Sequence, residues 1–108
     1  MKLTNPTILF SYALLLCLPV AAFAQNAPAD VAAGEKRAAV CFACHGKSGR
    51  AILPEYPNLA GQNRAYLEKA LRGYQTGTRT DPVMGPMAKP LSEADIRNIA
   101  AYFASLPR

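Results

Sequence analysis

The sequence predicts an all-α fold, and three observations support this prediction. Two stretches repeat apolar residues at the spacing of a helix, a third combines an N-capping residue with small side chains, and no stretch of useful length alternates with a period of two. Ordered loops are expected to join three main helices. These helices run from Asp30 to about Val40, from Asn63 to Gly73 or Gly77, and from Ser92 to Pro107.

Residues 1–24 are typical of a secretory signal peptide. Lys2 precedes an apolar run over residues 8–20, and Ala22-Phe23-Ala24 supplies the small residues of a cleavage site after Ala24. An uncleaved membrane anchor is the alternative, but the apolar run is short for a membrane span and contains Pro19. The sequence therefore predicts an exported protein.

Residues 25–108 are expected to form one mature domain. The formal net charge of the chain is +5 and falls by one when Lys2 leaves with the leader. This mild basicity lacks the aromatic and basic pattern of a nucleic-acid-binding protein. So short a domain buries little surface and usually needs a bound group or a crosslink for stability.

Small side chains mark the first predicted helix. Asp30 is its expected N-cap. The helix then carries residues that allow another backbone to approach closely, namely Ala32, Ala33, Gly34, Ala38 and Ala39. Residues 46–62 follow as a loop, because Pro54 and Pro57 are incompatible with a regular helix.

Apolar stripes mark the second and third helices. The second begins after its N-cap Asn63 and places on one face Tyr66, Leu67, Ala70, Leu71 and Tyr74. Gly73 and Gly77 are expected to end it. In the third helix, Ser92 and Asp95 have the spacing of a capping box. One face is predicted to be buried through Ile96, Ile99, Ala100 and Phe103.

The motif CFACH groups Cys41, Cys44 and His45 within about one helical turn. A redox-active dithiol would lie in an α/β domain, a zinc site needs four ligands, and a Cys41–Cys44 disulfide would close too short a loop to contribute much stability. Covalent haem attachment is the remaining interpretation. Residues at i, i+3 and i+4 share a helix face, so both thiols can form thioethers while His45 Nε2 binds the iron.

A second iron ligand cannot be histidine, because His45 is the only one. The candidates are Met84 and Met87, in a loop that Pro82 and two further prolines are expected to stiffen. Ordinary core packing is the alternative role for either methionine. Pro82 is expected to give Met84 an extended approach to the haem face opposite His45, with Met87 beside the ring edge. A thioether ligand stabilises ferrous iron and raises the reduction potential.

The chain resembles the class I cytochrome c family, most closely its small bacterial members of the c4 and c553 type. The matching segments follow the order of the family and read CFACHG, YPNLAGQ, YLEKALRGYQTGTR, MGPMAKPLS and IAAYFASL. The resemblance implies one haem c in a class I cytochrome c-like fold, with Gly34 of the first helix meeting the last helix near Tyr102. Proteins of the c4 type carry two such domains, whereas this chain has room for one.

The resemblance also implies roles for individual residues around the haem. The carbonyl oxygen of Pro57 should accept a hydrogen bond from His45 Nδ1, and Leu59 should pack on the haem face. The spacing of the family pattern favours Met84 over Met87 as the axial ligand.

Axial ligation by histidine and methionine indicates an exported electron-transfer protein rather than an enzyme. We expect a periplasmic carrier of a respiratory chain that passes single electrons from a donor dehydrogenase or cytochrome complex to an acceptor oxidase or reductase, with docking on a membrane complex as a further expectation. Neither a nucleic acid nor a small-molecule substrate is expected. The alternatives are a haem c subunit of a periplasmic dehydrogenase or oxidase complex, and a haem sensor or peroxidase, which would need an open coordination position.

Overall fold

Helix α2 (Val31–Arg37) is the first element in the part of the chain that the computed structural model describes, residues 27–108. The 3₁₀-helix η1 (Ala38–Cys41) and helix α3 (Phe42–His45) continue it without a break. Asp30 caps α2 as predicted, since its Oδ1 accepts a hydrogen bond from the Ala33 N–H at 3.0 Å. The predicted leader and its cleavage site lie outside the described residues.

Helix α4 (Arg64–Thr76) also begins at its predicted cap, where the Asn63 side chain accepts from the Tyr66 N–H at 2.9 Å. It ends at Gly77, which adopts the left-handed conformation with φ of 77°. Gly73 lies within the helix, so the prediction that it contributes to the helix end is wrong. The chain folds back over Gly73 instead, and the Arg79 N–H donates to its carbonyl oxygen at 3.1 Å.

A short helix, α5 (Met84–Ala88), replaces part of the loop predicted before the last helix. Asp81 Oδ1 accepts hydrogen bonds from the N–H groups of Val83 and Met84, each at 2.8 Å, and these bonds lower the pKa of the Asp81 carboxyl. The expected extended approach to Met84 is wrong, because this capped turn gives Val83 helical dihedral angles of −98° and −52°. Pro86 is tolerated because the first turn of a helix does not need its N–H group.

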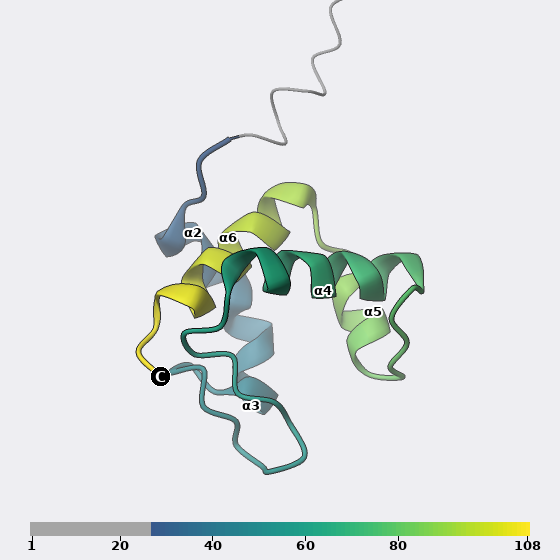
Figure 1. The fold of residues 1–108 in the computed structure, drawn as a ribbon, viewed down its shortest axis with the longest axis horizontal. Helices are drawn as coiled ribbons and strands as arrows, with labels where there is room; N and C mark the ends of the chain where they lie inside the picture. Colours follow the sequence, from purple (N-terminus) through teal and green to yellow (C-terminus); the bar gives the residue numbers. More distant parts are fainter. Residues whose placement is uncertain (1–26) are drawn as a thin grey trace, which may run out of the picture.

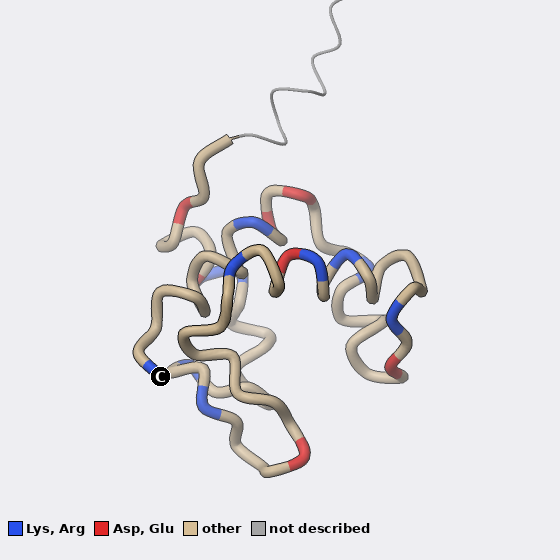
Figure 2. The backbone as a smooth tube through the Cα atoms, viewed as in Figure 1, with Lys and Arg blue, Asp and Glu red and all other residues tan. Residues whose placement is uncertain are grey.

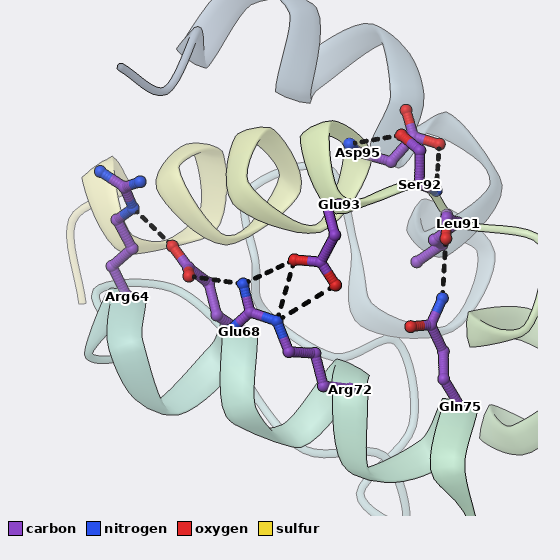
Figure 3. Close-up of polar contacts among 8 residues, drawn as sticks. All are labelled: Arg64, Glu68, Arg72, Gln75, Leu91, Ser92, Glu93 and Asp95. Atoms are coloured by element: carbon purple, nitrogen blue, oxygen red, sulfur yellow. Dashed lines mark hydrogen bonds and ion pairs between the residues drawn. The ribbon is translucent and has the colours of Figure 1, made fainter. Parts of the chain in front are cut away.

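Helix α6 (Glu93–Ser105) begins with the predicted capping box. The Asp95 N–H donates to Ser92 Oγ, and the Ser92 N–H donates to Asp95 Oδ2, both at 3.0 Å (Figure 3). The helix therefore starts where the sequence indicates. Residues 27–108 contain no strand, and the prediction of an all-α fold is confirmed.

Helices α2 and α6 cross in close contact (Figure 1). Gly34 is buried at this crossing, and a Cβ atom on it would collide with the carbonyl oxygen of Asn98 and would lie 3.1 Å from the Cβ of Tyr102. Asn98 also anchors the start of α2, because its Oδ1 accepts from the Asp30 N–H at 2.9 Å. The expectation that Gly34 meets the last helix near Tyr102 is confirmed.

Helix α4 lies across α6 and brings charged side chains of the two helices together. Arg72 donates to Glu93 Oε2 at 2.9 Å and to Glu68 Oε2 at 3.2 Å, which connects the two helices through their acidic residues (Figure 3). Gln75 Nε2 donates to the carbonyl oxygens of Ala88 and Leu91 at 2.9 and 2.7 Å. This amide fixes the end of α5 against α4.

The apolar core lies mainly on α6. Ile96 and Phe103 are its largest fully buried side chains. Around Phe103 packs one cluster of buried residues, which also contains Ala38, Leu67, Ile99, Ala100 and Tyr102. Within residues 27–108, no helix has both the length and the apolar composition that crossing a membrane requires.

The α2–α6 contact generates a stability prediction. Gly34→Ala should lower the free energy of unfolding by about 3 kcal/mol, because the new methyl group must displace the α6 backbone. Thermal unfolding of the purified protein measures the loss. The control is Gly85→Ala, which adds the same methyl group in α5 where no atom lies within 4 Å and should change stability by less than about 1 kcal/mol. Equal losses in the two variants would contradict the close approach at Gly34.

Candidate functional site

The side chains of the CFACH motif occupy the end of the first helical segment. Cys41 closes η1, while Cys44 and His45 belong to α3. Both thiols are free and half-buried, whereas the His45 side chain is buried. The local reason is the continuous helical path, which places residues at i, i+3 and i+4 on one side of the chain.

Phe42 anchors this motif to the core, a role that the sequence analysis missed. Its ring centroid lies 5.9 Å from that of Tyr102 and 6.4 Å from that of Phe103, both on α6. Aromatic pairs at such distances stabilise beyond the surface that they bury. An aromatic residue between the two cysteines was the signal that could have indicated it.

The imidazole ring of His45 is held by one hydrogen bond. Its Nδ1 lies 2.9 Å from the carbonyl oxygen of Pro57. Because a carbonyl oxygen can only accept, Nδ1 must carry the proton, and in the neutral ring the lone pair is then on Nε2. No hydrogen bond from His45 Nε2 to another described residue is present, so this nitrogen is available as a ligand.

The loop over residues 46–62 carries Pro57 and is ordered by its own backbone. The carbonyl oxygen of Gly49 accepts from the N–H groups of Leu59 and Ala60 at 2.8 and 3.0 Å. Gly49 has φ of 73°, and a Cβ on it would lie 2.6 Å from the Ala60 nitrogen, so only glycine fits here. Leu59 is partly buried and packs against the core cluster.

The surroundings of Cys41 differ from those of a reactive dithiol. Burial raises the pKa of the Cys41 thiol, and nearby Arg37 opposes this only in part, whereas a reactive dithiol needs a lowered pKa. Cys41 and Cys44 form no disulfide. Among residues 27–108, no group of three or more His, Cys, Asp and Glu side chains is placed to hold a metal ion.

The two candidate methionines share one face of α5. Met84 is the first residue of this helix and is half-buried, whereas Met87 is 38% exposed. Residues at i and i+3 of a helix are neighbours on its surface.

The residues of the site fit a covalently held haem. The fit rests on the donor set, which consists of two free thiols and a buried imidazole with one ring nitrogen unengaged. Apolar side chains are also exposed in the loop after α3 and just before α5. Examples are Ile52, which is 62% exposed, and Val83, which is 57% exposed. A large apolar macrocycle would give such side chains a partner.

A family comparison agrees with this chemistry. The family model described as Cytochrome c matches residues 31–107. Cytochrome c-554(548) of Halomonas halodenitrificans is 47% identical over 79 residues, which cover 70% of this chain and 95% of that protein. The thiosulfate dehydrogenase electron acceptor of Thiomonas intermedia is 44% identical over 81 residues, which cover 74% of this chain and 37% of that protein.

A solved structure shares the fold. Reduced recombinant cytochrome c4 from Pseudomonas stutzeri matches with a TM-score of 0.70 and 39% identity, over 74% of this chain and 47% of that chain. The chain thus spans less than half of the cytochrome c4 structure and of the thiosulfate dehydrogenase electron acceptor, but nearly the full length of cytochrome c-554(548).

The small core generates a prediction for the haem-free protein. Few large side chains are fully buried, so the helices alone should not offset the conformational entropy lost on folding. Haem-free protein should therefore melt without a cooperative transition, whereas haem-loaded protein should show a sharp one. Circular dichroism of both forms against temperature measures this difference. A sharp transition in the haem-free form would contradict the dependence of the core on haem.

Proposed function

The chain belongs to the cytochrome c family, whose members bind haem c covalently, and we propose that it is an exported carrier that passes single electrons between redox partner proteins. The observation that carries this proposal is the state of His45, whose Nδ1 is engaged by Pro57 and whose Nε2 is available beside two free thiols. When bound, haem c supplies an Fe(III)/Fe(II) couple that gains and loses one electron.

The two cysteines have the role of attachment. Cys41 and Cys44 would each hold the macrocycle through a thioether bond, so that it stays in place in both oxidation states. Phe42 supports this attachment by fixing the turn between them against α6.

His45 has the role of the first axial ligand. The Pro57 carbonyl oxygen holds the Nδ1 proton and thereby keeps the ring in one tautomer and orientation. The hydrogen bond that Nδ1–H donates also makes Nε2 a stronger electron-pair donor to a metal. Because His45 is buried, water does not compete with its Nδ1–H for the Pro57 carbonyl oxygen.

Met84 is our proposal for the second axial ligand. The Asp81 carboxylate fixes the backbone at Met84 through a hydrogen bond to its N–H at 2.8 Å, and Gln75 holds the other end of α5. Met84 is the less exposed of the two methionines. Two filled axial positions favour a carrier over a sensor or peroxidase, since these need an open position.

The partners in this proposal are proteins, consistent with the name of the Thiomonas intermedia relative as an electron acceptor. A donor dehydrogenase or cytochrome complex would reduce the protein, and an acceptor oxidase or reductase would oxidise it. The predicted signal peptide over residues 1–24 supports a periplasmic location, with residues 25–108 as the mature domain.

Covalent attachment predicts that the colour stays with the protein. After expression in a host that attaches c-type haem, acid-acetone should leave the haem on the chain, because thioether bonds survive this extraction. Cys44→Ala should retain at most one such bond and should unfold at a markedly lower temperature. Absorbance of the extracted solvent measures the attachment. Complete extraction of haem from the parent protein would contradict the assignment of Cys41 and Cys44.

Axial ligation predicts different effects for the two methionines, and this experiment tests the carrier function. Met84→Ala should abolish the weak long-wavelength band of Met-ligated ferric haem, lower the reduction potential and allow carbon monoxide to bind the ferrous protein. The matched control Met87→Ala should keep the band and shift the potential only modestly. Spectra and a potentiometric titration measure both effects.

The reverse behaviour of the two variants would assign the ligand to Met87 and leave the carrier function intact. Binding of carbon monoxide by the parent protein would contradict a closed iron and would favour a sensor or peroxidase.

A further inference from the structure

A polar pocket lies away from the CFACH motif, where three distant segments of the chain meet. Its lining comes from the loop after α3, the segment before α4 and the end of the chain after α6, through Arg50, Asn58, Ala60, Gln62 and Arg108. The pocket has a volume of about 260 Å³, several times the ~30 Å³ that one water molecule takes up in the liquid. In Figure 2 the chain end marked C carries the colour of Lys and Arg, with no Asp or Glu colour beside it.

The walls of this pocket are fixed by hydrogen bonds between the segments. The Gly61 N–H donates to the carbonyl oxygen of Phe103, and Arg108 Nε donates to the carbonyl oxygen of Gly61, both at 2.9 Å. The Ala60 N–H is bound to Gly49, as described above. These bonds hold the segment before α4 against the end of α6 and the last residue of the sequence, although the side chains of Arg50, Asn58 and Arg108 are exposed.

Two of the lining side chains are amides whose oxygens are already engaged. Asn58 Oδ1 accepts from the Ala51 N–H at 2.7 Å, and Gln62 Oε1 accepts from the Asn63 N–H at 2.8 Å. Each side chain is left with its NH₂ group for a ligand, since the amide nitrogen can only donate.

The two arginines add positive charge, and neither pairs with an acidic side chain of the described residues. Neither Arg50 nor Arg108 takes part in the ion pairs of residues 27–108, which instead engage Glu35, Glu68, Glu93 and Asp95. No acidic side chain lines the pocket. Arg108 uses its Nε for Gly61, so its terminal nitrogens remain to donate, and Arg50 has its whole guanidinium group.

We propose that this pocket binds a tetrahedral oxyanion of the sulfate or phosphate class. Two guanidinium groups and two amide NH₂ groups form a lining rich in donors, and a guanidinium group pairs with two oxygens of such an anion at once. A tetrahedral dianion presents oxygens in several directions and can therefore use donors from all three segments. Bound anion would neutralise the excess positive charge and join the loop after α3 to the chain end.

The experiment is a titration of the haem-loaded, reduced protein with sodium sulfate, followed by ¹⁵N–¹H correlation NMR. Ionic strength is kept constant by replacing sodium chloride. Saturable shifts are expected for the backbone amides of residues 50, 58–62 and 108. Arg50→Gln and Arg108→Gln should each weaken binding by at least about tenfold, because each removes charged hydrogen bonds.

Lys89→Gln is the matched control, since it removes one exposed positive charge after α5, outside the pocket, and should leave the affinity unchanged. Inorganic phosphate should shift the same amides as sulfate. Amide shifts that rise linearly with sulfate and never saturate would show nonspecific screening and overturn the proposal. An equal loss of sulfate affinity in all three variants would overturn it as well. Binding of acetate as tightly as sulfate would overturn the assignment to a tetrahedral dianion.

Discussion

The hydrogen bond from His45 Nδ1 to the Pro57 carbonyl oxygen is the constraint on which the rest of the site depends. It determines which ring nitrogen keeps a lone pair and in which direction that nitrogen points. The bond also joins α3 to the loop over residues 46–62. The orientation of the His45 ring and the conformation of the loop therefore depend on each other. The function proposed for His45 requires the whole loop to be in place.

The loop is in turn attached to the helical core at several points. Gly49 binds Leu59 and Ala60 through its carbonyl oxygen, and the Gly61 N–H binds the end of α6. Helix α6 then packs on α2 at Gly34, where no larger residue fits. A small set of close backbone contacts thus connects the helix crossing to the histidine.

Neighbouring residues of the loop over residues 46–62 belong to two different sites. Pro57 supports the buried imidazole, while Asn58 lines the proposed oxyanion pocket. The two sites differ in charge as well as in geometry. Most acidic side chains are used in ion pairs or helix caps elsewhere, and none of these ion pairs includes Arg50 or Arg108.

The sequence by itself determined the features that depend on near neighbours. The caps Asp30, Asn63 and Ser92 bind N–H groups three residues away, and the CFACH motif lies within about one helical turn, so helix starts and the attachment chemistry were predictable. The start of α5 and the chain reversal over Gly73 also depend on near neighbours, through the Asp81 cap and the Arg79 N–H, but the sequence analysis missed both. Only the tertiary structure decided that Phe42 anchors the motif on α6. It alone brought Arg50 beside Arg108. These outcomes depend on contacts between segments far apart in the chain, which local propensity and spacing do not encode.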